Sequence, residues 1–133
     1  MASPVGATLM LPDEVVSLAS GVAAVVAWTA VSIASQTGTQ TAKAAVLKVR
    51  AKALNPVVMG VASTATVSIR ESGTNPTTPR SVLASPGTIA SDSDSVERTV
   101  VVPVDENEEF DYKVVEGGTG SISWSISLEG WYL

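Results

Sequence analysis

The most constraining feature of this sequence is the strict alternation of serine with large apolar residues over residues 121–128. Because side chains two residues apart point to the same face of a β-strand, this pattern predicts a strand with one buried and one solvated face. An aromatic pair, Trp131 and Tyr132, follows it, whereas a frayed tail is usually small and polar. The sequence therefore predicts that the last strand is docked into a core.

Seven other segments have the short apolar or alternating patterns that are typical of strands. The segment over residues 96–104 contains Pro103, which cannot donate a ladder hydrogen bond, so this strand is expected to lie at a sheet edge or to end there. Eight strands without a helix predict an all-β fold, a two-sheet antiparallel β-sandwich that is jelly-roll-like. The seven segments are residues 28–33, 45–54, 57–62, 64–70, 81–84, 96–104 and 109–115.

Residues 1–26 are predicted to form an extended N-terminal arm, and residues 27–133 the β-sandwich domain. The arm is too irregular for a helix, with Pro4, Gly6 and Pro12, and too apolar for a free tail. Such a segment either covers its own domain or lies on a partner. The side chains that we expect to make this contact are Leu9, Met10, Leu11, Val15 and Val16.

An uncharged stretch over residues 15–42 raises the alternatives of a membrane span and a secretory signal. Serine and threonine interrupt it, and Asp13 and Glu14 precede it where a basic flank is typical. These features favour a buried strand with flanking loops, so we expect no membrane partner.

The residue types that the chain lacks limit its chemistry. It has no cysteine and no histidine, which excludes disulfides, Cys/His metal sites and the Ser-His or Cys-His constellations of nucleophilic catalysis. The net charge is −5, and an acidic excess with few aromatic residues argues against nucleic-acid binding. We therefore expect neither an enzyme nor a cofactor nor a nucleic-acid partner.

Two clusters of charge are candidate partner contacts. Lys48, Arg50 and Lys52 share one face of a predicted strand, and the turn after residue 104 is acidic. The simplest interpretation is that both clusters face water. The alternative is that they meet across a subunit boundary of a symmetric oligomer, where complementary charge sets the register. The acidic candidates are Asp105, Glu106 and Glu108.

The same turn has oxygen-bearing side chains at every second position, namely Asp105, Asn107, Glu109 and Asp111. Calcium binds several such ligands at once, but the glycine that bends an EF-hand loop is missing. A solvated acidic turn is therefore favoured over a calcium site, and no metal ligand is predicted.

The three tryptophans have two interpretations. Trp124 alternates with serine and is predicted to be buried, as aromatic residues commonly are. Sugar-stacking platforms are the alternative, and Trp131 at the end of the chain is the better placed of the three to be exposed.

Six short segments together resemble the strand ends of small β-sandwich domains of tailed bacteriophages, which occur as head decoration (cement) proteins and as terminal domains of tail fibres. The resemblance spans about residues 27–133, and it is a pattern of strand ends without a catalytic signature. The chain departs from the pattern at Ser32, where an acidic residue is common. The segments are residues 28–31 (WTAV), 42–47 (AKAAVL), 70–74 (RESGT), 101–105 (VVPVD), 110–114 (FDYKV) and 130–133 (GWYL).

The resemblance implies a homotrimer, or another symmetric cluster, on the outer surface of a virion capsid. Its partner is expected to be the major capsid protein, with the N-terminal arm reaching onto the shell or a neighbouring subunit. Because the chain starts with methionine and holds one domain, a decoration protein is preferred to a fibre. The alternative is a tail-fibre or receptor-binding module that recognises host surface glycans through loops such as residues 71–95.

Overall fold

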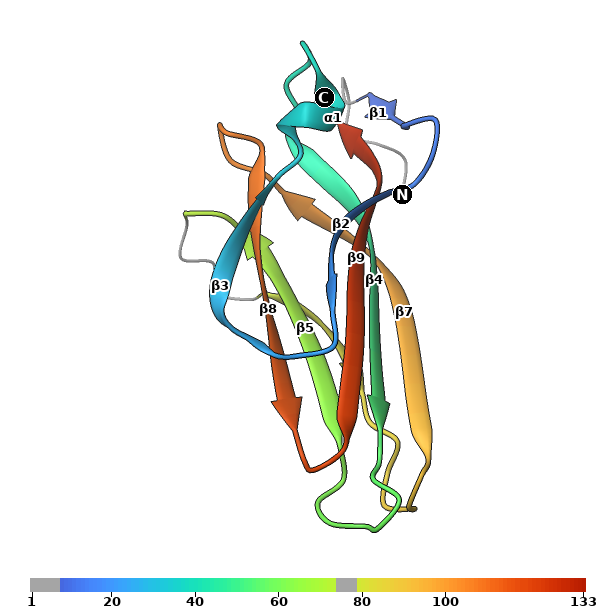
Figure 1. Ribbon diagram of the computed structural model, residues 1–133. Helices are drawn as coiled ribbons and strands as arrows, with labels where there is room; N and C mark the ends of the chain where they lie inside the picture. The colour runs from blue at the N-terminus through green and yellow to red at the C-terminus, as the bar shows by residue number, and fades with distance from the viewer. Residues whose placement is uncertain (1–7, 74–78) are drawn as a thin grey trace.

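The computed structural model describes residues 8–73 and 79–133, which form nine strands and one short helix (Figure 1). The helix, α1 (Ala34–Thr37), is a single turn in the connection between β3 and β4. No helix of the described residues is long and apolar enough to cross a membrane. The strands are β1 (Leu9–Met10), β2 (Val16–Gly21), β3 (Val25–Ser32), β4 (Ala44–Leu54), β5 (Thr64–Glu71), β6 (Arg80–Ala84), β7 (Ser93–Pro103), β8 (Glu109–Gly117) and β9 (Ser121–Tyr132).

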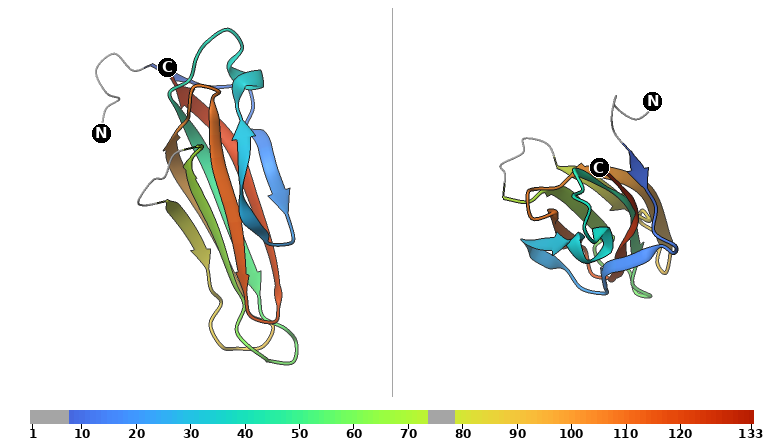
Figure 2. Two further views of the ribbon diagram at one scale, coloured as in Figure 1. Left: turned by 90° about the vertical axis from the view of Figure 1, so that its left-hand side faces the viewer. Right: turned by 90° about the horizontal axis from the view of Figure 1, so that it is seen from above.

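The strands form two antiparallel sheets that face each other (Figure 2). One sheet has the order β2-β9-β4-β7, with β1 as a further short strand on β9, and the other has the order β3-β8-β5-β6. From β2 onward, consecutive strands lie in opposite sheets except at the β5–β6 pair. This is the strand order of an eight-stranded jelly roll, so the predicted sandwich is confirmed. The edge strand β7 ends at Pro103, as its proline predicts.

The core lies between the sheets and is built from the inward-facing positions of each strand. On β9, the apolar residues from Ile122 to Leu128 are buried and the alternating serines are not, as the sequence pattern predicts. From the opposite sheet, the one phenylalanine of the chain, Phe110, is fully buried on β8. Alternation therefore identifies which face of each central strand packs inward.

Part of the predicted N-terminal arm belongs to the sandwich. Residues 16–21 form β2 and pair with β9, and the division predicted at residue 26 falls inside β3. The register shifts between Ser17 and Ala19, so that Leu18 and Ala19 both pack against the core. This bulge breaks the period of two, which is why alternation does not mark β2 in the sequence.

The strand predicted over residues 57–62 is wrong, because these residues form most of the loop between β4 and β5. Val57, Val58 and Val61 are exposed in that loop. Apolar, β-branched composition is typical of a buried strand, and here the same composition covers a surface instead.

The sandwich is elongated, and most of its connections gather at two opposite ends, whereas the connection between β2 and β3 lies at its side (Figures 1 and 2). At one end lie three loops, residues 55–63, 85–92 and 118–120, which together are called the loop tip. At the other end lie α1, the turn between β7 and β8, and residues 9–15, which are called the N-terminal segment. The surfaces discussed below lie at these two ends and on the two outer sheet faces.

Candidate interaction surfaces

The basic stripe of Lys48, Arg50 and Lys52 lies on the outer face of the β2-β9-β4-β7 sheet, opposite the buried residues of β4. Two of its members already contact the neighbouring strand β7. Lys48 Nζ lies 3.5 Å from Glu97 Oε1, and Arg50 Nε donates a hydrogen bond of 3.4 Å to Ser95 Oγ. The stripe is therefore partly neutralised within its own sheet, which reduces the charge that it can offer to another subunit.

An open hollow of about 270 Å³ lies beside this stripe. Its polar groups are guanidinium, ammonium and hydroxyl groups, which are suited to an anionic or hydroxyl-rich ligand. The hollow is lined by Arg50, Lys52, Ser123, Trp124 and Ser125.

The acidic turn holds itself together with its own carboxylates. Asp105 Oδ1 accepts hydrogen bonds from the backbone N–H groups of Asn107 and Glu109, each at 2.9 Å. Glu108 is buried, and its Oε1 atom accepts hydrogen bonds of 2.7 Å from Thr37 Oγ1 and from the Ala42 backbone N–H. Of the acidic residues predicted to contact a partner, Glu106 is exposed, whereas Glu108 is used inside the chain.

Replacing Glu108 with alanine should lower the free energy of unfolding by about 2 kcal/mol, because the Ala42 N–H would lose its acceptor in a buried place. The Thr37 hydroxyl would lose its shorter hydrogen bond and keep only the Ala34 carbonyl, at 3.3 Å. Urea denaturation measures this loss. Glu106→Ala removes an exposed carboxylate from the same turn and should change stability little. Equal effects of the two substitutions would show that the Glu108 carboxylate does not join α1 to the turn.

The structure does not bring the four alternating oxygen ligands of this turn to one point. Asp105 is turned toward backbone N–H groups, and Asp111 lies on the outer face of the other sheet, where its Oδ2 atom is 3.3 Å from Arg70 Nε. Within residues 8–73 and 79–133, no group of three or more acidic side chains could hold a metal ion.

Trp28 lies on the outer face of the β3-β8-β5-β6 sheet, and two cationic side chains lie over its ring. Arg70 lies 4.1 Å and Lys113 4.9 Å from the centre of its ring, and Arg70 is also paired with Asp111. Cation–π contacts of this kind stabilise the packing of β3, β8 and β5 on their outer face. Sequence reasoning did not find this cluster, although all three residues occupy outward positions on neighbouring strands.

The other two tryptophans are buried, as predicted for Trp124. The Trp124 Nε1 atom donates a hydrogen bond of 2.9 Å to the Ala23 carbonyl, and its ring centre lies 5.3 Å from that of Tyr112. Trp131 is 5% exposed. Neither ring is therefore available as a sugar-stacking platform.

The N-terminal segment presents apolar side chains to solvent. β1 pairs with the last residues of β9, and the Leu133 N–H donates to the Thr8 carbonyl at 2.9 Å. Of the five predicted contact residues, Met10 and Val16 pack against the core. The other three, Leu9, Leu11 and Val15, are exposed. The chain thus holds these three residues at one end without burying them.

The loop tip presents a second set of exposed aliphatic side chains at the opposite end. Val57, Val58, Val61 and Ile89 are 65–85% exposed. Sequence reasoning missed this surface because the same residues were interpreted as a buried strand. The flanking Asn55-Pro56 marks the end of β4, but it does not show whether the valines that follow it are buried or exposed.

Hydrogen bonds from buried polar groups fix the loop tip. Asn55 is 2% exposed; its Oδ1 atom accepts from the Ser63 N–H at 2.8 Å, and its Nδ2 atom donates to the carbonyls of Gly87 and Ile89 at 2.9 Å. Ser63 Oγ in turn accepts a hydrogen bond of 2.7 Å from the Gly120 N–H. The three loops are therefore joined into one structure.

Comparison with known proteins gives little sequence evidence. No protein-family model and no curated protein matches the sequence. Among solved structures, the chain is similar to a chain in the crystal structure of the T13 IBDV viral particle, with a TM-score of 0.36 and 12% sequence identity. The alignment covers 95% of this chain and 34% of that chain. This chain therefore spans about a third of the length of the viral chain that it matches.

Proposed function

We propose that this chain is a non-enzymatic structural protein of a virion, a decoration (cement) protein that binds the outside of the capsid and stabilises the shell. The observation that carries this proposal is the N-terminal segment, in which Leu9, Leu11 and Val15 are exposed next to a sheet that holds the backbone in place. A fixed, exposed apolar surface is typical of a protein–protein contact. The jelly-roll strand order supports the same role, since capsid domains commonly have it.

The proposed mechanism is thermodynamic. A protein that binds the assembled shell and not its separate subunits stabilises the assembled state in proportion to its affinity and concentration. The proposed partner is the major capsid protein, and the N-terminal segment contributes affinity by burying its three aliphatic side chains. A homotrimer would multiply the contacts and raise the avidity.

Virions assembled without this chain should lose their genome at a lower temperature, or under a milder osmotic shock, than virions that carry it. Adding the purified protein back should restore the stability, and adsorption to cells should be unchanged. The measurement is a thermal-release assay on both kinds of particle. Particles with equal stability and reduced adsorption would instead support a receptor-binding role.

Contact through the N-terminal segment is tested by substitution and not by truncation, because deleting residues 1–20 would remove most of β2 from the sheet. The double variant Leu11→Ser with Val15→Ser should bind undecorated particles at least about 10-fold more weakly, since hot-spot side chains dominate such contacts. Leu83→Ser, which changes an exposed leucine on β6, is the matched control. Unchanged binding of the double variant would place the contact elsewhere.

A second candidate function is a tail-fibre or receptor-binding module, which the hollow beside Arg50 and Lys52 favours. Its cations and serines are suited to a sugar that carries a carboxylate or sulfate group. Part of the loop region first considered for this role, residues 74–78, lies outside the described residues. Binding of acidic oligosaccharides that is lost in Arg50→Ala with Lys52→Ala would support this candidate.

A further inference from the structure

We infer that the loop tip is a second docking surface, and that it binds an apolar depression on a capsid protein bordered by basic side chains. This inference rests on the proposed function and deepens it. A molecule that contacts the shell with both ends lies along the surface and joins two neighbouring sites, whereas a molecule that contacts it with one end stands upright.

The first support is the exposure of the tip. Val57, Val58 and Val61 in one loop and Ile89 in the next are 65–85% exposed, and Met59 lies between the valines. Ile89 belongs to the same surface as the valines because Asn55, at the base of their loop, donates to the Ile89 carbonyl. The Ser91 N–H also donates to the Pro56 carbonyl at 3.1 Å. Single exposed aliphatics are ordinary, but a group on adjoining loops marks an interaction surface.

The second support is that the tip is built to keep its shape. Thr119 donates from both its N–H and its hydroxyl to the Val61 carbonyl, at 3.1 and 3.2 Å. Gly60 packs so closely on Thr119 that a Cβ there would lie 2.7 Å from its hydroxyl oxygen. A preorganised loop loses less conformational entropy on binding, so its apolar contacts contribute more of their energy to affinity.

The charges around the tip select a basic partner. The loop tip, residues 55–63, 85–92 and 118–120, contains one charged side chain, that of Asp92. Within three residues of these loops stand two further acids, Asp94 and Glu116, and one base, Lys52. An anionic lipid surface would repel this acidic border, and two tips placed together would bring like charges into contact. A protein surface with basic residues around an apolar depression is complementary to it.

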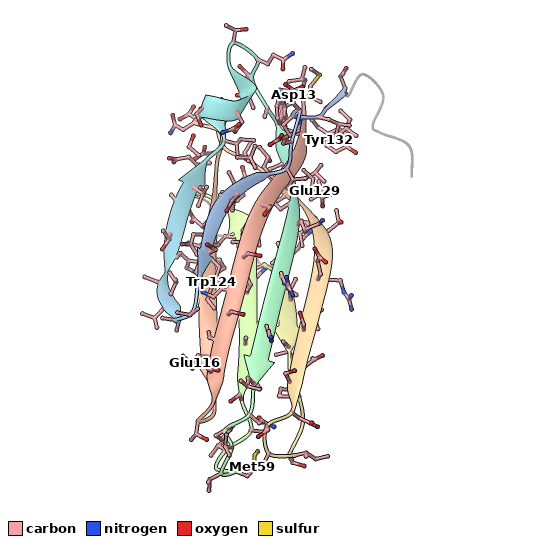
Figure 3. The ribbon with its side chains drawn as sticks, turned by 45° about the vertical axis from the view of Figure 1, so that its right-hand side comes forward. Asp13, Met59, Glu116, Trp124, Glu129 and Tyr132 are labelled. Carbon is pink, nitrogen blue, oxygen red and sulfur yellow. The ribbon has the colours of Figure 1, made fainter. Side chains whose placement is uncertain are left out.

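The third support is the position of the tip relative to the N-terminal segment. In Figure 3, Met59 marks the tip at one end of the long axis, and Asp13 and Tyr132 lie at the opposite end. Two exposed apolar surfaces at opposite ends cannot both meet one flat contact site. They can, however, reach two sites on a continuous shell, which joins neighbouring capsid subunits and resists their separation.

The test measures binding of the full chain to virus particles assembled without it. The double variant Val57→Ser with Val58→Ser should bind at least about 10-fold more weakly than the unchanged chain. Val22→Ser with Val26→Ser is the matched control, because these valines are 77% and 85% exposed but belong to the β2–β3 connection and to β3, outside the loop tip. Binding of this control should be unchanged. Asp92→Lys with Glu116→Lys should also weaken binding, because it reverses the border charge.

The outcomes separate the two proposals. If the unchanged chain does not bind the particles, the proposed function fails. If it binds and the tip variant binds equally well, the inference about the tip fails and the proposed function stands. Two further results would overturn the tip inference: co-sedimentation of the chain with phosphatidylserine vesicles that is lost in the tip variant, or a self-association in light scattering that is lost in the tip variant.

Discussion

Replacing Gly120 with alanine should lower the free energy of unfolding by about 5 kcal/mol or more, at the extreme of what single substitutions do. A Cβ at this position would overlap the Leu54 carbonyl oxygen and the Ser63 hydroxyl oxygen. The Leu54 carbonyl is backbone at the end of β4, and the Ser63 hydroxyl already accepts a hydrogen bond from the Gly120 N–H. Neither group can therefore move away without breaking the contacts that join the loops of the tip. Urea denaturation followed by tryptophan fluorescence measures the loss.

Gly38→Ala is the matched control for this prediction. Gly38 has a positive φ of 66°, but no atom lies within 4 Å of a Cβ built on it. The ψ of Gly38, −122°, places it outside the left-handed helical region, in a conformation that favours glycine strongly. The substitution should therefore cost backbone strain alone, about 1–3 kcal/mol. If Gly120→Ala costs no more than Gly38→Ala, the loops of the tip can shift apart easily, and the tip is not preorganised.

Replacing Asn55 with alanine should lower the free energy of unfolding by about 3 kcal/mol, because the buried Ser63 N–H and the Gly87 carbonyl lose their partner at once. The Ile89 carbonyl loses one of its two hydrogen bonds and keeps the one from the Asp92 N–H. The loss should be local as well as global. Amide hydrogen exchange of residues 57–61 and 87–91 should become faster, since this side chain joins the two loops. Denaturation and exchange measured on the same variant test both expectations.

Asn107→Ala is the control for Asn55→Ala, because Asn107 is an exposed asparagine in a turn at the opposite end of the molecule. Its substitution should change stability by less than about 0.5 kcal/mol. A small effect of Asn55→Ala with unchanged exchange at the tip would contradict the role that the structure gives to this side chain.

The fold could be predicted from the sequence wherever a strand is buried on one face only. β9 is the clearest case, because each serine is followed by an apolar residue and the pleat of a strand has the same period. β4 and β8 follow the same rule. β2 escaped prediction for a local reason, since the bulge at Leu18 shifts the pattern by one residue.

The candidate surfaces were harder to predict, because composition indicates whether a residue type is usually buried or exposed and not where a given residue lies in the fold. The valines after Pro56 have the composition of a buried strand, and only the three-dimensional structure shows that they cover an exposed tip. Glu108 is the converse case. It stands among solvated acids in the sequence, but the fold buries it against α1, where it satisfies two donors. Both errors come from contacts between segments far apart in the chain.

The central place of β9 has a consequence for the synthesis of this protein. β9 lies between β2 and β4, so the strands made first and the strands made in the middle are joined by the strand that is made last. On the ribosome, neither β2 nor β4 can pair with β9 until residues 121–132 have emerged. Pairings between such distant segments form slowly, and the nascent chain exposes unpaired strand edges while it waits. We therefore expect the larger sheet to be completed only after β9 has emerged from the ribosome, and the unfinished chain to be prone to aggregation until then.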